Sequence, residues 1–193
     1  MGTNVMVDLE TFGVGNKAAI ISIGAVKFDQ TKIIDRFHVG VNPETSESAG
    51  LVLSASTVVW WLDPERAPAW EAWSALEKFD LPLALSGFAM WYSDPCVSGD
   101  MIPEGGHPHK FGEQLPIWGN GATFDNVILR SAFEACGMAY PAKFFNDRCY
   151  RTIKSLLPDI KLERTGTHHS AVDDAESQAV HLQRLCAQLG VVL

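Results

Sequence analysis

The chain has 193 residues, of which 47% are hydrophobic, and it carries a formal net charge of −8. This length and apolar content predict one folded domain over residues 1–193. The acidic charge argues against a protein that grips long nucleic acid through clustered Lys and Arg, although carboxylates that hold cations can still meet phosphate. Neither a signal peptide nor an apolar run of about 18 residues is found, so we expect a soluble, cytoplasmic protein.

The first part of the chain is rich in β-branched residues and predicts three consecutive strands. These strands cover residues 4–10, 19–29 and 32–43. Turns are expected over residues 29–31 and 43–48. Because the strands follow one another through short loops, they predict an antiparallel meander.

Helical spacing marks the next segments. Four tryptophans recur at this spacing within residues 57–79 and predict two helices with a break at residues 64–68, where prolines occur. A further helix is expected over residues 81–92. Residues 93–114 are dense in Gly and Pro and predict a long loop or insertion.

Strands and helices alternate in the second half of the chain. A strand is expected at residues 115–121, then a helix over 122–137 that Gly137 ends, and then a strand-like segment at 144–152 leading into a short helix. The final helix is expected over residues 171–189. Strands first and then strands alternating with helices predict an α/β fold, with a mixed sheet flanked by helices.

The first strand carries two acidic residues. Side chains alternate between the faces of a strand, so Asp8 and Glu10 project to one side, while Val7 and Leu9 project to the other. Two carboxylates at this spacing can share a divalent ion. The alternative is a strand whose polar face is simply in contact with solvent.

The final helix and the loop before it carry the strongest local pattern. Ser170 followed by Asp173 is typical of an N-cap, which places His169 on the preceding loop. At about 100° per residue, one inward stripe is formed by Ala171, Ala175, Gln178, Leu182, Leu185 and Leu189. Asp174 lies on the flank of this stripe and faces inward, whereas Asp173 points to the opposite side as cap and solvent face. An inward carboxylate is costly unless it is paired or bound to metal. His169 can face the same cavity as a general base, and the alternative is a capping or surface histidine, with His168 as its competitor.

A third acidic residue, Asp125, opens the helix that follows the strand at residues 115–121, so it can reach a cavity at the end of that strand. The alternative is an ordinary aspartate of the first helical turn. Together, the strings VDLETFG, GNGATFDN and HSAVDDA resemble the DEDDh, or DnaQ-like, superfamily of 3′→5′ exonucleases, which has a ribonuclease H-like fold. The spacing from His169 to Asp174 is that of the histidine subclass. The sequence departs from many relatives at Gly121, where they carry Asn.

The resemblance implies a two-metal mechanism. Asp8 would bridge both ions, Glu10 and Asp174 would complete the site that holds the nucleophilic water, and Asp125 would support the second ion. His169 would take the proton of the water. Oxygen ligands favour Mg²⁺ or Mn²⁺, and the products would be nucleoside 5′-monophosphates released from a 3′ end.

Six residues are candidates for contact with the substrate. By resemblance, Phe12 would wedge against the terminal base and the backbone of Thr11 would meet the 3′ hydroxyl. Either Trp60 or Trp61 can stack a base, although one of the two is expected in the core. Arg148 and Arg151 are candidate phosphate contacts, and the alternative for both is a solvated face.

The double tryptophan and the RCYRTI segment are most similar to a phage and bacterial branch, the Rv2179c-like exoribonucleases. The expected partners are 3′ ends of single-stranded DNA or RNA, without a choice between the two sugars. A homodimer is also considered, because dimers occur among relatives, and the location would be the host cytoplasm for a phage protein. Two alternatives are a metal-dependent module that binds nucleic-acid ends without turnover, and a phosphoesterase of small nucleotides.

Overall fold

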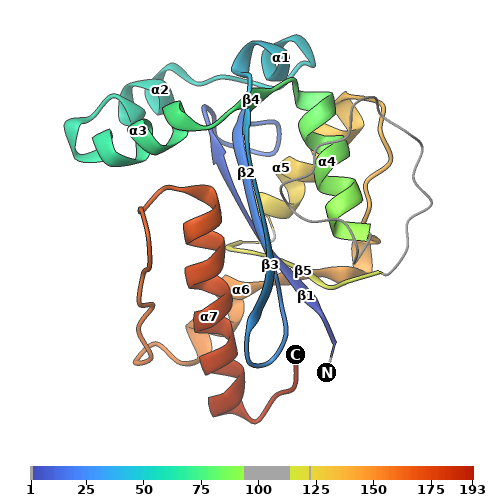
Figure 1. Ribbon diagram of the computed structural model, residues 1–193, viewed down its shortest axis with the longest axis vertical. Helices are drawn as coiled ribbons and strands as arrows, with labels where there is room; N and C mark the ends of the chain where they lie inside the picture. Colours follow the sequence, from blue (N-terminus) through green and yellow to red (C-terminus); the bar gives the residue numbers. More distant parts are fainter. Residues whose placement is uncertain (1, 94–113, 122) are drawn as a thin grey trace.

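The computed structural model describes residues 2–93, 114–121 and 123–193. Its centre is a six-stranded mixed sheet with the order β4-β3-β2-β1-β5-β6, which Figure 1 shows nearly edge-on between two groups of helices. The α/β fold expected from the sequence is therefore confirmed. Apart from its two end residues, the predicted loop at 93–114 lies outside the described residues.

The antiparallel meander forms as predicted from three strands, namely β1 (Asn4–Thr11), β2 (Ile20–Phe28) and β3 (Ile33–Val41). β2 is buried along its whole length, which explains its near-continuous run of apolar residues. The other strands are short and parallel to their neighbours: β4 (Lys78–Phe79) pairs with β3, β5 (Ile117–Gly119) with β1, and β6 (Asp147–Cys149) with β5. β4 was not predicted, because two residues carry no alternation pattern.

Helices cover both faces of the sheet. On one face lie α4 (Leu81–Ser93) and α5 (Asp125–Ala135), packed on the apolar side chains of β1 that include Val7 and Leu9. On the other lie α6 (Tyr150–Leu156) and α7 (Ala171–Leu189), packed on Met6. Within the described residues no helix is both long and apolar enough to cross a membrane.

A tryptophan-rich arm extends from one end of the sheet (Figure 1). It consists of α2 (Ala55–Trp61), a 3-10 turn η1 (Pro64–Arg66) and α3 (Ala67–Ala75), so the predicted break between two helices is confirmed. The turn expected at 43–48 was wrong, because this stretch forms a helix, α1 (Pro43–Ser48). Asn42 accepts a hydrogen bond from the Glu44 N–H, and the proline occupies the first turn. The strand-like segment at 144–152 is a second 3-10 turn, η2 (Phe144–Asn146), followed by β6 and α6.

The last helix is fixed at both ends. A Cβ atom on Gly24 would lie 2.1 Å from the carbonyl carbon of Ala171, so the glycine allows the first turn of α7 to rest directly on β2. Ser170 is the N-cap residue, although its side chain makes no capping hydrogen bond. Gly190 ends α7 with a φ of 67°, a conformation that glycine adopts without strain. β1, β2 and α7 therefore form one rigid unit around the acidic residues.

Candidate active site

The first two carboxylates lie on the α7 side of β1, as the alternation of the strand predicted. Asp8 Oδ1 accepts a hydrogen bond of 2.8 Å from Gln178 Nε2 of α7. Glu10 is buried, and its Oε1 has no hydrogen-bond partner among the described residues. Burial and the neighbouring carboxylates raise the pKa of both acids well above their usual values.

Asp125 reaches the same region from the start of α5. Its Oδ1 accepts a hydrogen bond of 3.3 Å from the Leu9 N–H, and its Oδ2 accepts one of 2.9 Å from the Asn120 N–H. A Cβ atom on Gly119 would lie 2.3 Å from Asn126 Oδ1 and 3.0 Å from Asp125 Cβ, so this glycine allows α5 to begin against β5. Burial raises the pKa of Asp125 to about 6, although the backbone hydrogen bonds act to lower it.

Asp174 joins the group from α7, with only 6% of its surface exposed, as the helical periodicity predicted. Its Oδ2 accepts a hydrogen bond of 3.1 Å from the His169 N–H, and its Oδ1 forms a hydrogen-bonded ion pair with the Arg164 guanidinium. Asp173 was expected to act as a cap on the solvent side of the helix. It is half-buried, and its Oδ2 accepts a hydrogen bond of 2.8 Å from the Thr167 N–H, which anchors the loop before α7.

His169 takes a left-handed backbone conformation, with a φ of 65°. Its ring stacks on that of His168, with 3.8 Å between the ring centroids. It makes T-shaped contacts with Trp60 and Trp61, at 5.0 Å and 6.1 Å between centroids. Burial is the main cause that lowers the pKa of His169, followed by the neighbouring His168, while Asp174 acts to raise it. A lowered pKa favours the neutral imidazole, which is the form that can accept a proton.

The acidic group fits a divalent cation. One oxygen each from Asp8, Glu10 and Asp174 lie within 4.8 Å of one another, and His168, His169 and Asp174 form a second group of this kind. Buried carboxylates held together are costly unless a cation or a proton neutralises them. The oxygen of Glu10 that lacks a partner supports a ligand that the protein itself does not supply. Oxygen donors of this type suit hard divalent ions.

These residues line a cavity of about 530 Å³. It contains all five predicted catalytic residues and four of the six predicted substrate contacts. The four are Thr11, Trp60, Trp61 and Arg151. The other two, Phe12 and Arg148, lie elsewhere.

Phe12 does not face the cavity, contrary to its expected place against a terminal base. It is 7% exposed, and its ring packs against Trp70 at 6.2 Å and Trp73 at 5.9 Å between centroids. Both tryptophans belong to the arm, and the sequence alone did not show that the arm folds over this position. Phe12 is therefore part of the small core between the arm and β2.

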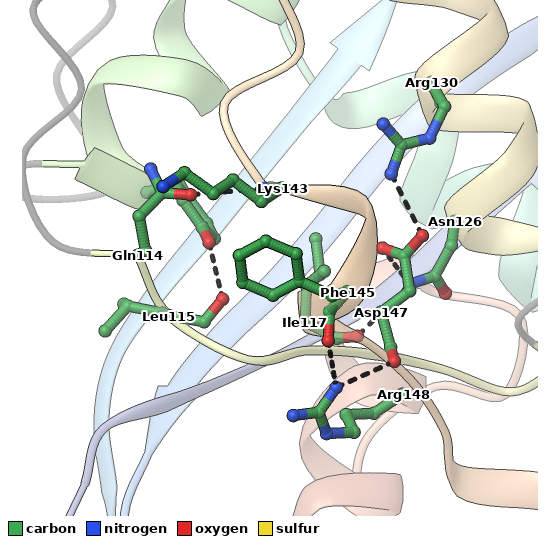
Figure 2. Close-up of polar contacts among 10 residues, drawn as sticks. Gln114, Leu115, Ile117, Asn126, Arg130, Lys143, Phe145, Asp147 and Arg148 are labelled. Carbon is green, nitrogen blue, oxygen red and sulfur yellow. Dashed lines mark hydrogen bonds and ion pairs between the residues drawn. The ribbon is translucent and has the colours of Figure 1, made fainter.

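Arg148 was expected at a substrate phosphate but lies on β6, outside the cavity. Its Nη1 donates to the carbonyl oxygens of Phe145 at 2.7 Å and Asp147 at 3.0 Å, as Figure 2 shows. The Asp147 carboxylate accepts hydrogen bonds from Asn126 at 3.2 Å and Arg130 at 2.9 Å. These contacts hold α5 against β6, so the polar groups here support the start of the helix that carries Asp125.

Of the remaining predicted contacts, Trp61 is buried, whereas Trp60 and Arg151 are exposed. Trp61 is 3% exposed, and its Nε1 donates to the Thr11 carbonyl at 3.0 Å, so it belongs to the core at the cavity edge. Trp60 is 38% exposed, with the Arg66 guanidinium 3.9 Å from its ring centroid. Arg151 reaches the cavity from α6, and its Nη2 donates to the Asn120 carbonyl at 2.6 Å.

Sequence reasoning missed two residues in the centre of the site. Gln178 was predicted on the inward stripe of α7, and a polar residue on that stripe was the signal that it holds a partner there. Arg164 lies on an irregular segment without periodicity, so no signal in the sequence pointed to it. Gly121, where relatives carry Asn, has a φ of 119°, and a Cβ atom there would lie 3.2 Å from the Arg151 guanidinium carbon. A side chain at 121 would be strained and would crowd Arg151.

The mixed sheet brings Asp, Glu, Asp, Asp and His side chains together in one cavity, which is the arrangement expected of a 3′→5′ exonuclease of the DEDDh type. The chain belongs to the Rv2179c-like family, described as the 3′-5′ exoribonuclease Rv2179c-like domain, whose family model matches residues 3–186. The resemblance inferred from the motifs is therefore confirmed. A search of the curated proteins gives no match.

Solved structures share the fold. The nuclease domain of 3′hExo, a DEDDh family member bound to rAMP, has a TM-score of 0.61 at 15% identity, over 97% of this chain and 92% of that one. Exonuclease I has a TM-score of 0.63 at 12% identity, over 97% of this chain and 42% of that one. E. coli Exonuclease I in complex with a dA16 oligonucleotide gives 0.56 at 13% identity, over 98% and 43%. At these identities the likeness establishes the fold, which is that of ribonuclease H-like exonucleases.

Proposed function

We propose that this protein removes nucleotides from the 3′ end of single-stranded nucleic acid by a two-metal hydrolysis. The observation that carries the proposal is the convergence of four carboxylates from β1, α5 and α7 with His169 in one open cavity. Membership of an exoribonuclease family supports RNA as the preferred strand, and DNA is the second candidate. The products would be nucleoside 5′-monophosphates.

The residues would hold two ions of Mg²⁺ or Mn²⁺. Asp8, Glu10 and Asp174 would hold one ion, and Asp8 would share the other with Asp125. When bound, the ions supply charge neutralisation at the phosphate, an acidified water and stabilisation of the leaving oxygen. Gln178 orients Asp8 through its hydrogen bond of 2.8 Å, which leaves the other oxygen of Asp8 free to turn toward the cavity.

His169 would act as the general base. Its lowered pKa keeps the ring ready to accept a proton near neutral pH, and the rings of Trp60 and Trp61 restrict its position. The exposed Trp60 would stack the terminal base in place of Phe12, and Arg151 would contact the phosphate backbone. Every residue assigned here comes from one copy of the chain, so the proposed mechanism does not depend on a homodimer.

The test uses 5′-labelled RNA and DNA oligomers of the same sequence, incubated with Mg²⁺, Mn²⁺ or EDTA. We expect a ladder that shortens from the 3′ end, requires the cation and progresses faster on RNA. The variant His169→Asn keeps a side chain that tolerates a positive φ but removes the base, so cleavage should fall by roughly 100-fold or more. The matched variant is His168→Asn, at the exposed neighbouring histidine.

Binding measurements separate the alternatives. Tight cation-dependent binding of the 3′ end without cleavage would replace the proposal by an end-binding module. Hydrolysis of small nucleotide esters without shortening of oligomers would replace it by a phosphoesterase of small nucleotides.

A further inference from the structure

Arg164 lies on the segment between α6 and α7, which runs beside α7 in Figure 1. Hydrogen bonds attach this segment to α7 both after and before Arg164. The Thr165 N–H donates to Ser177 Oγ at 3.0 Å, and the Thr167 N–H donates to Asp173 Oδ2 at 2.8 Å. Farther back, the Ile160 carbonyl lies 2.9 Å from Nε2 of the buried His181. The backbone at Arg164 is therefore held at the edge of the cavity.

The side chain of Arg164 enters the cavity and pairs with Asp174. Asp174 has both oxygens engaged, Oδ1 by the guanidinium and Oδ2 by the His169 N–H. The Arg164 side chain keeps 40% of its surface exposed, so only one end of it is committed to the carboxylate. This arrangement differs from the pair Arg184–Glu163, at 3.1 Å, which lies outside the cavity.

A cation at the acidic group and the Arg164 guanidinium compete for the negative charge of Asp174. The proposed function assigns Asp174 to the cation, and its Oδ2 also accepts the His169 N–H. A bound cation neutralises the carboxylate and repels the guanidinium, which favours release of the guanidinium from Oδ1. Because the backbone of Arg164 is anchored, the displaced group stays within the cavity, where a phosphate that meets the cation must also lie.

We propose that Arg164 exchanges Asp174 for a phosphate oxygen of the substrate when the cation binds. In the metal-free protein the guanidinium neutralises Asp174, and in the loaded protein it binds the phosphate of the 3′-terminal nucleotide. This inference rests on the proposed function for the place of the cation. A guanidinium suits the second role, because its fork of N–H donors matches two oxygens of one phosphate.

The experiment measures binding and does not depend on turnover. Isothermal titration gives the affinity for Mn²⁺ alone and then for adenosine 5′-monophosphate in saturating Mn²⁺, the nucleotide serving as probe of the terminal phosphate. For Arg164→Gln we expect Mn²⁺ to bind at least as tightly as to the wild type, because the competing guanidinium is gone. The nucleotide should bind about 10-fold more weakly, since one charge-assisted interaction is lost.

Two further variants make the outcome specific. Arg164→Lys keeps the charge but lacks the fork, so nucleotide affinity should recover only in part. Arg184→Gln removes an exposed ion pair from the same region and should change neither affinity. Thermal unfolding in EDTA should show a lower Tm for Arg164→Gln than for Arg184→Gln, because Asp174 then lacks its counter-ion.

Wild-type nucleotide affinity in Arg164→Gln would overturn the inference, as would a parallel loss of Mn²⁺ affinity. A wild-type protein that binds Mn²⁺ and nucleotide but shortens no oligomer would instead refute the proposed function. In that case the comparison between the Arg164 and Arg184 variants would still decide the role of Arg164.

Discussion

The raised pKa of Asp125 makes a quantitative prediction for the stability of the metal-free protein. Its pKa is about 6 in the folded state, against an ordinary value of 3.8. A raised pKa means that the folded state holds the proton more tightly than the unfolded state. The resulting stability is fully present below about pH 4 and is lost as the pH rises through about 6. The perturbation is the variant Asp125→Asn, which cannot titrate.

The magnitude follows from the size of the shift. A change from 3.8 to about 6 corresponds to at most about 3 kcal/mol. About 2 kcal/mol of this should appear between about pH 4.5 and about pH 8. The raised pKa values of Asp8 and Glu10 act in the same direction, and removal of the Asp125 charge also relieves Asp8. The difference in pH dependence between the wild type and the variant should therefore reach about 2 kcal/mol.

Urea unfolding in EDTA at several pH values measures this difference, with fluorescence and circular dichroism recorded together so that coincident transitions establish one-step unfolding. Asp125→Asn loses a backbone hydrogen bond, because its NH₂ group cannot accept from a main-chain N–H, and this lowers its stability by a similar amount at every pH. The variant should nevertheless lose less stability than the wild type as the pH rises. Parallel stability profiles for the two proteins would refute the reasoning. Saturating Mg²⁺ should flatten the wild-type profile, since bound cation replaces the proton.

Four further substitutions test separate parts of the site. Gln178→Leu should weaken Mn²⁺ binding by about 10- to 100-fold, because Asp8 loses the amide that orients it, and isothermal titration measures this. Gly119→Ala should lower the free energy of unfolding by about 1–3 kcal/mol, since the added Cβ overlaps the start of α5, and wild-type stability in urea would contradict the close approach. Arg151→Ala should raise the KM for an oligomer several-fold, whereas Arg148→Ala should leave it unchanged, and equal effects would contradict the placement of both arginines.

The carboxylates could be placed from the sequence because each lies on an element with a regular period. The two-residue repeat of β1 put Asp8 and Glu10 on one face, and the helical repeat of α7 turned Asp174 inward. Such periodic patterns predict burial well, because the sheet and the helix bury the faces that the period defines. Leu189 is an exception on the predicted stripe, since it lies at the end of α7 and is 38% exposed.

The substrate contacts were harder to predict, because tertiary packing decides them. Phe12 follows the acidic strand directly, and only the folded arm with Trp70 and Trp73 shows that its ring is covered. Arg148 and Arg151 are three residues apart, yet one lies on β6 and the other on α6. The change from strand to helix between them directs the two side chains to different parts of the surface. The composition of this segment does not predict where that change occurs.

Trp60 and Trp61 have different roles at the site, because one is exposed to the cavity and the other supports it. Trp61 binds the Thr11 carbonyl and so ties α2 to the end of the acidic strand. Its neighbour Trp60 presents a ring to the cavity and contacts His169, while Arg66 covers part of that ring. One short helix thus fixes the position of the histidine and offers a stacking surface beside it. A nucleobase that stacks on Trp60 would lie against His169, the proposed general base. Recognition of the strand end and orientation of His169 therefore depend on the same contact.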